Sequence, residues 1–168
     1  MREKISVEHV KAEVQRFWST FSTKDSQSMM HFYAAGATVF NSSSSRQELG
    51  PVNAARRGRE YFQSGTIIRF RLGDIRVELL GEHCDSAIAS YVFQFHATNV
   101  VTASGATEEN IQLGRATQIF ARDQFGSLRI MHEHLSMPAW PSAGLEMSTA
   151  YLPEHPGFHR ADSTEHRT

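Results

Sequence analysis

The chain of 168 residues is poor in cysteine, lacks long hydrophobic runs and carries almost no net charge. Its single cysteine, Cys84, excludes an internal disulfide, and no basic cluster beside it favours a reactive thiolate. No apolar run approaches the roughly 18 residues of a membrane span, and the N-terminus is charged, so we expect neither a membrane span nor a signal peptide and predict a cytoplasmic protein. The formal net charge of −1, with dispersed basic residues, argues against nucleic-acid binding.

Length and composition are those of one globular domain. Hydrophobic residues make up 40% of the chain and charged residues 21%, which is ordinary for a domain that builds its own core. After Trp140 the sequence becomes polar and rich in proline, glycine and histidine. We therefore expect a folded domain over residues 1–141 and an extended or partly disordered tail over residues 142–168.

Hydrophobic periodicity predicts helices in the first third of the chain. Apolar residues at spacings of three and four form one stripe of an amphipathic helix: Val7, Val10, Val14, Phe17 and Phe21. Asp25 or Ser26 can cap a second helix that runs through Tyr33. Residues 37–40 form a predicted short strand, and residues 58–65 a third, short helix.

From Ile67 onward the sequence is rich in β-formers. Four long segments, over about residues 67–80, 86–101, 110–122 and 128–137, are separated by short turns with Gly, Asp or Ser. Helices followed by an antiparallel meander are typical of an α+β fold, in which helices cover one face of a curved sheet.

The most informative stretch is the last predicted hairpin, whose strands flank a turn over residues 123–127. Side chains alternate between the two faces of a strand. One face of the first strand therefore carries Arg115, Thr117 and Ile119, and one face of the second carries Ile130, His132, His134 and Ser136. A cation, hydroxyls and imidazoles in otherwise apolar strands need partners, which a ligand pocket supplies. A polar row facing solvent is the alternative.

Short motifs follow one another along the chain: Phe32-Tyr33-Ala34, Ala37-Thr38-Val39-Phe40, Gly58-Arg59-Glu60, Arg115-Ala116-Thr117 and His132-Glu133-His134-Leu135-Ser136. Over roughly residues 7 to 138, their order and spacing resemble the SnoaL-like branch of the nuclear-transport-factor-2-like superfamily. The resemblance implies a cone-shaped barrel, with a curved antiparallel sheet of four to six strands wrapped around three N-terminal helices. It also implies a mostly apolar pocket and a homodimer that pairs through the sheet.

A small-molecule site built on this plan would use three catalytic residues. We expect Arg115 to hold a carboxylate or enolate oxygen, His134 to move a proton and Tyr91 to assist with its hydroxyl. The expected substrate-binding residues are Trp18, Phe40, Phe62, Phe93, Thr117, His132 and Ser136. The expected function is that of an isomerase, cyclase or lyase that acts on a small organic or carboxylate-like substrate without a cofactor.

Two other functions remain open on the same fold. The pattern is similar to the association domain of calmodulin-dependent kinases, an oligomerisation module whose pocket binds small carboxylates, so a non-catalytic binder is one alternative. A metal-free carbonic-anhydrase-like hydratase is the other. Members of that class have a His-His-Ser-Ser run where this chain has Glu133-His134-Leu135-Ser136, so only His134 and Ser136 match.

We expect neither ketosteroid isomerase activity nor a metal site. Ketosteroid isomerases place a carboxylate base where this chain has Asn41, and a hydrogen-bond donor near Phe17; an amide cannot abstract a proton from carbon. His132 and His134 have the spacing of paired metal ligands on a strand, but the sequence places no third ligand beside them. A positive charge at Arg115 would also oppose a cation, so we expect no metal.

Overall fold

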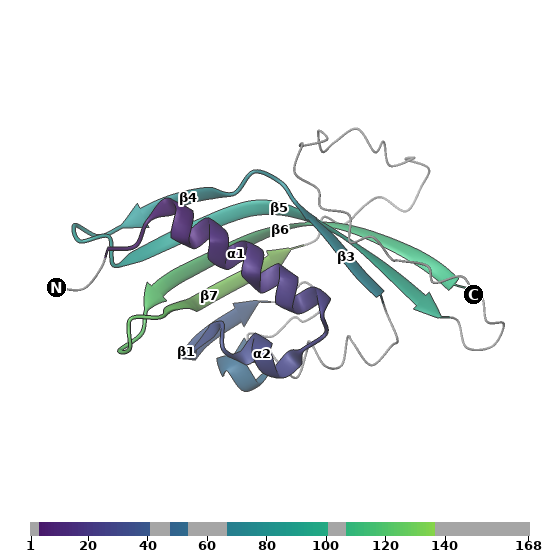
Figure 1. The fold of residues 1–168 in the computed structure, drawn as a ribbon, viewed down its shortest axis with the longest axis horizontal. Helices are drawn as coiled ribbons and strands as arrows, with labels where there is room; N and C mark the ends of the chain where they lie inside the picture. Colours follow the sequence, from purple (N-terminus) through teal and green to yellow (C-terminus); the bar gives the residue numbers. More distant parts are fainter. Residues whose placement is uncertain (1–3, 41–47, 54–66, 101–106, 137–168) are drawn as a thin grey trace, which may run out of the picture.

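The computed structural model describes residues 4–40, 48–53, 67–100 and 107–136, which hold two complete helices, a helical stretch at residues 50–53 and seven strands. Helices α1 (Val7–Ser22) and α2 (Ser26–Met30) come first. The strands follow (Figure 1): β1 (Tyr33–Phe40), β2 (Glu48–Leu49), β3 (Ile67–Leu72), β4 (Arg76–Leu80), β5 (Ser86–Val100), β6 (Thr107–Arg122) and β7 (Leu128–Ser136). The predicted third helix over residues 58–65 and the tail over residues 142–168 lie outside the described ranges.

The strands form one curved sheet in the order β2-β1-β7-β6-β5-β3, with β4 also paired to β5. Helix α1 crosses one face of it (Figure 1). The predicted α+β class, with helices on one face of a curved sheet, is confirmed. The predicted antiparallel meander is confirmed from β3 to β7, and β1 joins the sheet by pairing in parallel with β7. No tight turn joins these two strands, so nothing local imposes the antiparallel direction that hairpins require.

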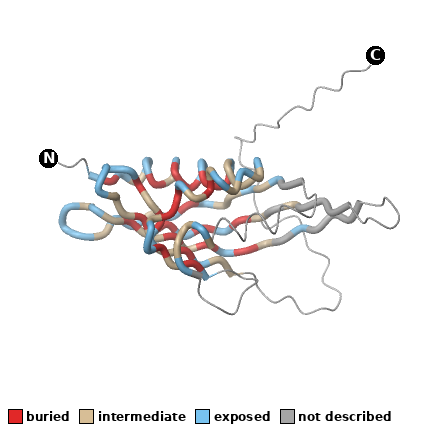
Figure 2. The backbone as a smooth tube through the Cα atoms, turned by 90° about the horizontal axis from the view of Figure 1, so that it is seen from below, coloured by how far each residue is buried: buried red, intermediate tan, exposed pale blue. Residues whose placement is uncertain are grey.

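Helix α1 follows its predicted stripe. Ser6 caps it by accepting a hydrogen bond from the backbone N–H of His9 at 3.2 Å, and Val10, Val14, Phe17 and Trp18 are buried. The buried residues lie on the side of α1 that meets the sheet (Figure 2). Helix α1 therefore forms the lid of the hydrophobic core.

Helix α2 is shorter than predicted. Asp25 caps it, with its carboxylate accepting from two backbone N–H groups, but the helix ends at Met30 and Tyr33 already begins β1. Tyr33 pairs with Ile130 of β7 and is buried. Tertiary pairing thus prevails over the local apolar periodicity that extended the predicted helix through Tyr33.

The predicted strand over residues 67–80 is two strands, separated by residues 73–75. The Gly73 N–H donates to the carbonyl of Val92 at 2.8 Å. Both β3 and β4 then pair antiparallel with β5, whose long hairpin with β6 spans from Ser86–Ala121 to Val100–Thr107. β5 and β6 are therefore the two longest paired strands, to which the other strands of the sheet are added.

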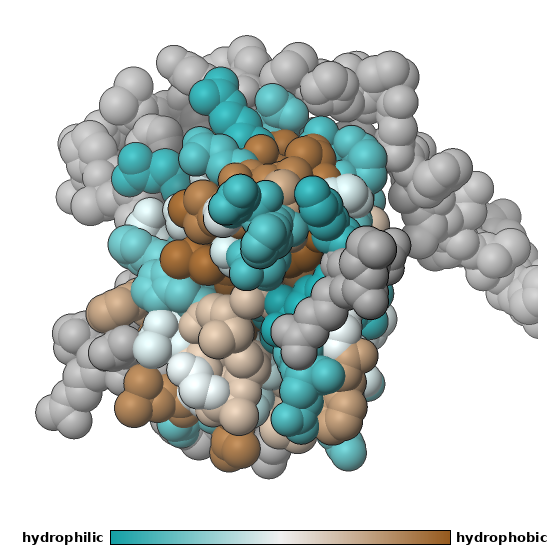
Figure 3. All heavy atoms as spheres, turned by 90° about the vertical axis from the view of Figure 1, so that its left-hand side faces the viewer, coloured by the Kyte–Doolittle hydropathy of each residue, from teal (hydrophilic) through white to brown (hydrophobic). Residues whose placement is uncertain are grey.

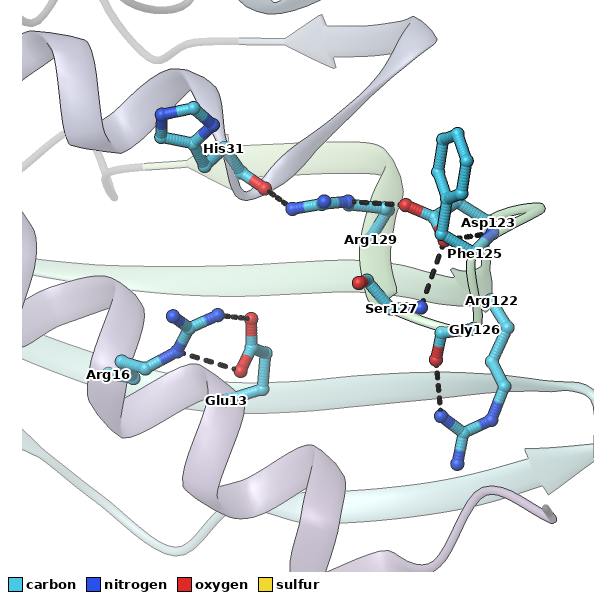
Figure 4. Close-up of polar contacts among 9 residues, drawn as sticks. All are labelled: Glu13, Arg16, His31, Arg122, Asp123, Phe125, Gly126, Ser127 and Arg129. Atoms are coloured by element: carbon cyan, nitrogen blue, oxygen red, sulfur yellow. Dashed lines mark hydrogen bonds and ion pairs between the residues drawn. The ribbon is translucent and has the colours of Figure 1, made fainter.

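The turn between β6 and β7 is the predicted hairpin turn. The Asp123 carboxylate accepts from the backbone N–H groups of Phe125 and Ser127, both at 2.9 Å, and Gly126 has a positive φ of 85°. The other carboxylate oxygen of Asp123 accepts a hydrogen bond from Arg129 Nε at 2.9 Å (Figure 4). These bonds fix the register at which β7 leaves the turn.

Several of these turns lie at one end of the molecule, which Figure 3 views directly. Hydrophobic residues there lie between hydrophilic ones and form no uninterrupted apolar face in that view. None of the described helices is long and apolar enough to cross a membrane.

Gly114 of β6 makes room for an aromatic ring of β5. Phe93 is its cross-strand partner, and a Cβ at Gly114 would lie 2.3 Å from the ring's Cζ. The ring cannot retreat easily, because it is buried and stacks on Trp18 with centroids 4.7 Å apart. A side chain at position 114 would therefore force a shift of the core.

We expect Gly114→Ala to lower the free energy of unfolding by about 1–3 kcal/mol through this overpacking. Urea denaturation measures the effect. Gly36→Ala is the matched control, since no atom lies within 4 Å of a Cβ there. Equal midpoints for the two variants would contradict the prediction.

Candidate functional site

The polar row predicted on β6 and β7 does form, but on the outer face of the sheet. Arg115 and His134 are exposed, and Thr117 and Ser136 are half-buried. The register brings them together, with Arg115 opposite Ser136 and Thr117 opposite His134. The prediction that this row faces a core pocket is wrong. The inner face of β6 carries instead the buried residues Gly114, Ala116, Gln118 and Phe120.

A β-bulge in β7 decides which of its residues face inward. Ile119 pairs with His132 and Phe120 with Ile130, so Met131 is an extra residue on β7. Strict alternation places Ile130 on one face with His132 and His134. The bulge changes the phase, so that Ile130 and Glu133 are the buried residues, 0% and 2% exposed, while Met131 and His134 are exposed.

The two imidazoles of β7 lie beside the end of β1. The Thr38 hydroxyl and His132 Nδ1 share a hydrogen bond of 2.7 Å. The Phe40 ring, expected to line a pocket, is 39% exposed and lies edge-on to His132 and near His134, with centroids 5.9 and 6.0 Å apart. Phe40 thus belongs to the outer face together with these histidines.

A buried chain of hydrogen bonds occupies the space between α1 and the sheet. Trp18 Nε1 donates to the Tyr91 hydroxyl at 2.8 Å, and that hydroxyl donates to Gln118 Oε1 at 3.0 Å. Gln118 Nε2 donates to Glu133 Oε2 at 2.6 Å, and the Tyr33 hydroxyl donates to Glu133 Oε1 at 2.9 Å. We call these five residues the Glu133 network; they come from α1, β1, β5, β6 and β7.

Aromatic rings surround the network. Trp18 packs against Phe93 and, with centroids 6.0 Å apart, against Phe70. The Phe17 ring lies edge-on to the Tyr33 ring at 6.1 Å. Polar groups enclosed by such walls exert strong electrostatic effects, because little water screens them. The network is thus a small set of converging polar groups held between apolar walls.

Of the predicted site residues, the structure brings Tyr91, Trp18 and Phe93 together in the interior. Phe62 lies outside the described ranges. The sequence analysis missed Glu133, Gln118 and Tyr33. The signal that could have indicated Gln118 and Glu133 is that each is a polar residue in a β-rich segment. Because the sequence analysis assigned the opposite faces of β6 and β7 to the interior, it placed these two residues on the outer face.

Burial acts on every titratable group of the network. It raises the pKa of Glu133, and the hydrogen bonds donated by Gln118 and Tyr33 oppose that rise without cancelling it. Burial, followed by the nearby charge of Glu133, raises the pKa of Tyr33 and of Tyr91 well above 10.0. Both phenols therefore keep their protons at neutral pH, while Glu133 ionises closer to neutrality than an exposed glutamate does.

This raised pKa makes stability depend on pH in a definite direction. Between the ordinary pKa of 4.5 and the higher folded value, the folded state binds more protons at Glu133 than the unfolded state does. The free energy of unfolding therefore falls as pH rises through that window. We expect the stability difference between the native chain and Glu133→Gln to favour the native chain most below pH 4.5 and to decline above it.

Urea titrations of both proteins from about pH 4 to about pH 8 measure this difference, in which the contributions of all other groups cancel. A difference that stays constant, or that grows in favour of the native chain as pH rises, would contradict a raised pKa at Glu133.

Metal ligands do not converge in the part of the chain that the structure describes. No group of three or more His, Cys, Asp or Glu side chains comes together there. His132 contacts Thr38, and Glu133 turns to the opposite face of β7 from its two histidine neighbours.

Comparisons with known proteins agree with the fold. The sequence model of the SnoaL-like domain family matches residues 10–140 of this chain. A dehydratase-named protein of the NTF2-like family from Streptomyces avermitilis is similar in structure, with a TM-score of 0.68, 17% identity, and coverage of 80% of this chain and 97% of that one. A search of curated proteins gave no match.

Two further solved structures have the same fold. A protein named for scytalone dehydratase from Novosphingobium aromaticivorans has a TM-score of 0.67 and 6% identity, covering 82% of this chain and 87% of that one. A protein from Xanthomonas campestris, named for the calcium/calmodulin-dependent protein kinase II association domain, has a TM-score of 0.65 and 16% identity, with coverage of 83% and 91%. Identities this low establish the fold alone.

Proposed function

Because the chain belongs to the SnoaL-like domain family, we propose that it is a small-molecule enzyme of the isomerase, cyclase or lyase kind with Glu133 as its proton-transfer group. The observation that supports this most is the burial of that carboxyl, 2% exposed, among apolar walls. Proton transfer is most efficient when the pKa of the catalytic group lies near the working pH. Burial moves the pKa of Glu133 in that direction.

Tyr33 and Tyr91 supply the second part of the proposed chemistry. Their raised pKa values keep both hydroxyls protonated. Tyr33 now donates its proton to Glu133 and Tyr91 donates its proton to Gln118, so a substrate oxygen that gains negative charge in the transition state would replace one of these acceptors. Donors held in a water-poor site stabilise such an oxyanion strongly. The proposed roles are thus Glu133 as base and the tyrosines as donors.

An uncharged substrate fits this site best. Among the described residues, the groups that contact the Glu133 carboxylate are neutral, namely Gln118 and Tyr33, and Arg115 lies on the outer face. A carboxylate ligand next to ionised Glu133 would place two negative charges together without a counter-charge. We therefore propose a neutral carbonyl or hydroxyl compound in place of the carboxylate-like ligand expected from the sequence.

Incubation with a panel of neutral aryl and cyclic ketones and β-hydroxyketones in D₂O tests the proposal. Mass spectrometry reads deuterium gain, which reports proton abstraction next to a carbonyl, and loss of water, which reports a lyase. Arg115→Ala and His134→Ala test the roles predicted from the sequence. If either abolishes turnover while Glu133→Gln does not, the sequence-based assignment holds and the Glu133 assignment is wrong.

One observation favours a second candidate, a non-catalytic binding module. Both oxygens of Glu133 accept hydrogen bonds from protein groups, so the network is complete without a ligand. A structural neighbour named for an association domain has the same fold. If no compound of the panel reacts and Glu133→Gln alters only stability, this candidate replaces the enzyme.

We also propose a homodimer that pairs through the outer face of the sheet. Exposed apolar side chains accompany the polar row there: Phe40, Val92, Ile111 and Met131, each 37–41% exposed. Covering them would remove apolar surface from water. Size-exclusion chromatography with light scattering tests the proposal, and a monomer at micromolar concentration would overturn it.

A further inference from the structure

The hydrogen bonds of the Glu133 network all run in one direction. An indole N–H can only donate, an amide oxygen can only accept, and an ionised carboxylate can only accept. This series of hydrogen bonds begins at Trp18, which donates, and ends at Glu133, which accepts through both oxygens. The identity of the first residue therefore bears on the charge of the last.

The opposite direction would require Gln118 to turn its amide over. Its NH₂ would then face the Tyr91 oxygen, and Tyr91 would have to turn its own proton toward the indole N–H of Trp18, 2.8 Å away. Two donors would oppose each other at that contact. Tyr91 is only 5% exposed, so no bulk water could accept its proton there. Trp18 thus disfavours the reversed arrangement.

The reversed arrangement also requires a different charge at Glu133. Gln118 Oε1 would face Glu133 Oε2 across the present contact of 2.6 Å. Two acceptors can meet there only when Glu133 carries a proton to place between them. The direction of the chain and the ionisation of Glu133 are therefore coupled.

We propose that Trp18 is a positioning residue: its N–H fixes the direction of the Tyr91–Gln118 hydrogen bonds and thereby holds Glu133 as an ionised acceptor. The consequence for turnover rests on the proposed function, since it concerns the same carboxylate. The effect of Trp18 on Glu133 itself does not depend on catalysis.

The groups that face Glu133 within the described ranges support this coupling. They are the Tyr33 hydroxyl from β1 and the Gln118 amide from β6, with the Tyr91 hydroxyl of β5 and the Trp18 indole of α1 behind them. Tyr33 and Tyr91 are the titratable members. The hydrogen bond from Gln118 lowers the pKa of Glu133, and the one from Trp18 lowers the pKa of Tyr91.

The test is the pKa of Glu133 in Trp18→Phe, which removes the N–H and keeps a ring. NMR of protein labelled at the glutamate side-chain carboxyl carbon reads the titration, and Glu133→Gln identifies the signal. We expect the pKa of Glu133 to rise by about one unit at most, because the lost bond joins two neutral groups and the net contribution of such a bond is about 1 kcal/mol. Tyr91→Phe interrupts the same chain and should shift the pKa in the same direction, which keeps the test open if Trp18→Phe does not fold.

Phe21→Leu is the control. Phe21 packs edge-on to the Trp18 indole with centroids 5.5 Å apart, so this variant loosens the ring without removing the N–H, and the pKa should not move. If the pKa of Glu133 is the same in Trp18→Phe and Tyr91→Phe as in Phe21→Leu, the inference is overturned. Turnover that survives Glu133→Gln would instead overturn the proposed function and leave this result standing.

Discussion

Replacing Glu133 by glutamine is expected to reduce turnover of a responsive substrate by about 10²- to 10⁴-fold, the usual contribution of a positioned acid or base. Glutamine keeps the shape of the side chain and can still bond to Tyr33 and Gln118, but it cannot take up a proton. The loss should appear in kcat more than in KM, because the proton moves only in the transition state. Rates of deuterium gain or water loss measure it.

Glu13→Gln is the matched control for this change. Glu13 is also buried, 7% exposed, but it lies on α1 and pairs with Arg16 (Figure 4). The same substitution there removes a buried carboxylate outside the Glu133 network, so turnover should remain near that of the native chain. Equal losses for the two variants would mean that the effect reflects general destabilisation, and the catalytic role of Glu133 would be rejected.

Replacing Gln118 by leucine is expected to lower the free energy of unfolding by about 2–4 kcal/mol. Gln118 is 0% exposed and lies between Tyr91 and Glu133. Leucine fills much the same volume but leaves the Tyr91 proton and one Glu133 oxygen without partners. A buried charge that loses its hydrogen-bond donor is especially costly. Urea denaturation measures the loss, which should grow as pH rises because the ionised fraction of Glu133 increases.

The double variant Gln118→Leu with Glu133→Met separates the missing bond from simple repacking. Once the charge is also removed, no ionised oxygen remains unpaired, so the double variant should recover a large part of the lost stability. If the two substitutions instead add, as they do at independent positions, the interaction between Gln118 and Glu133 contributes little. The cycle thus tests the central contact of the network directly.

Local sequence signals were sufficient for the elements that depend on neighbours along the chain. The stripe of α1 needs only its own spacing, and the caps at Ser6 and Asp25 bond within three residues. The turn at Asp123 is likewise closed by its own carboxylate. The α+β class follows from the order of such elements, because helices then strands have few ways to cover one another.

The face of β6 that enters the core could not be read from alternation. Its inner residues include Gly114 and Ala116, while the outer face carries Arg115 and Thr117, so neither face has the more hydrophobic pattern. Gly114 faces the core because its missing side chain leaves room for the Phe93 ring of β5, which lies over it. That reason becomes visible only once the two strands are paired.

The sequence by itself therefore determined the class of fold, the lid helix and the hairpins, because each depends on contacts within a few residues. Tertiary structure decided the site. The bulge at Met131 exists only in the pairing of β7 with β6, and it brings Glu133 inward and leaves His134 outside. The partners of Glu133 then come from β1 and β6, and the rest of the network comes from α1 and β5. A carboxylate becomes a buried, chemically useful group only where such distant segments enclose it and supply its hydrogen bonds.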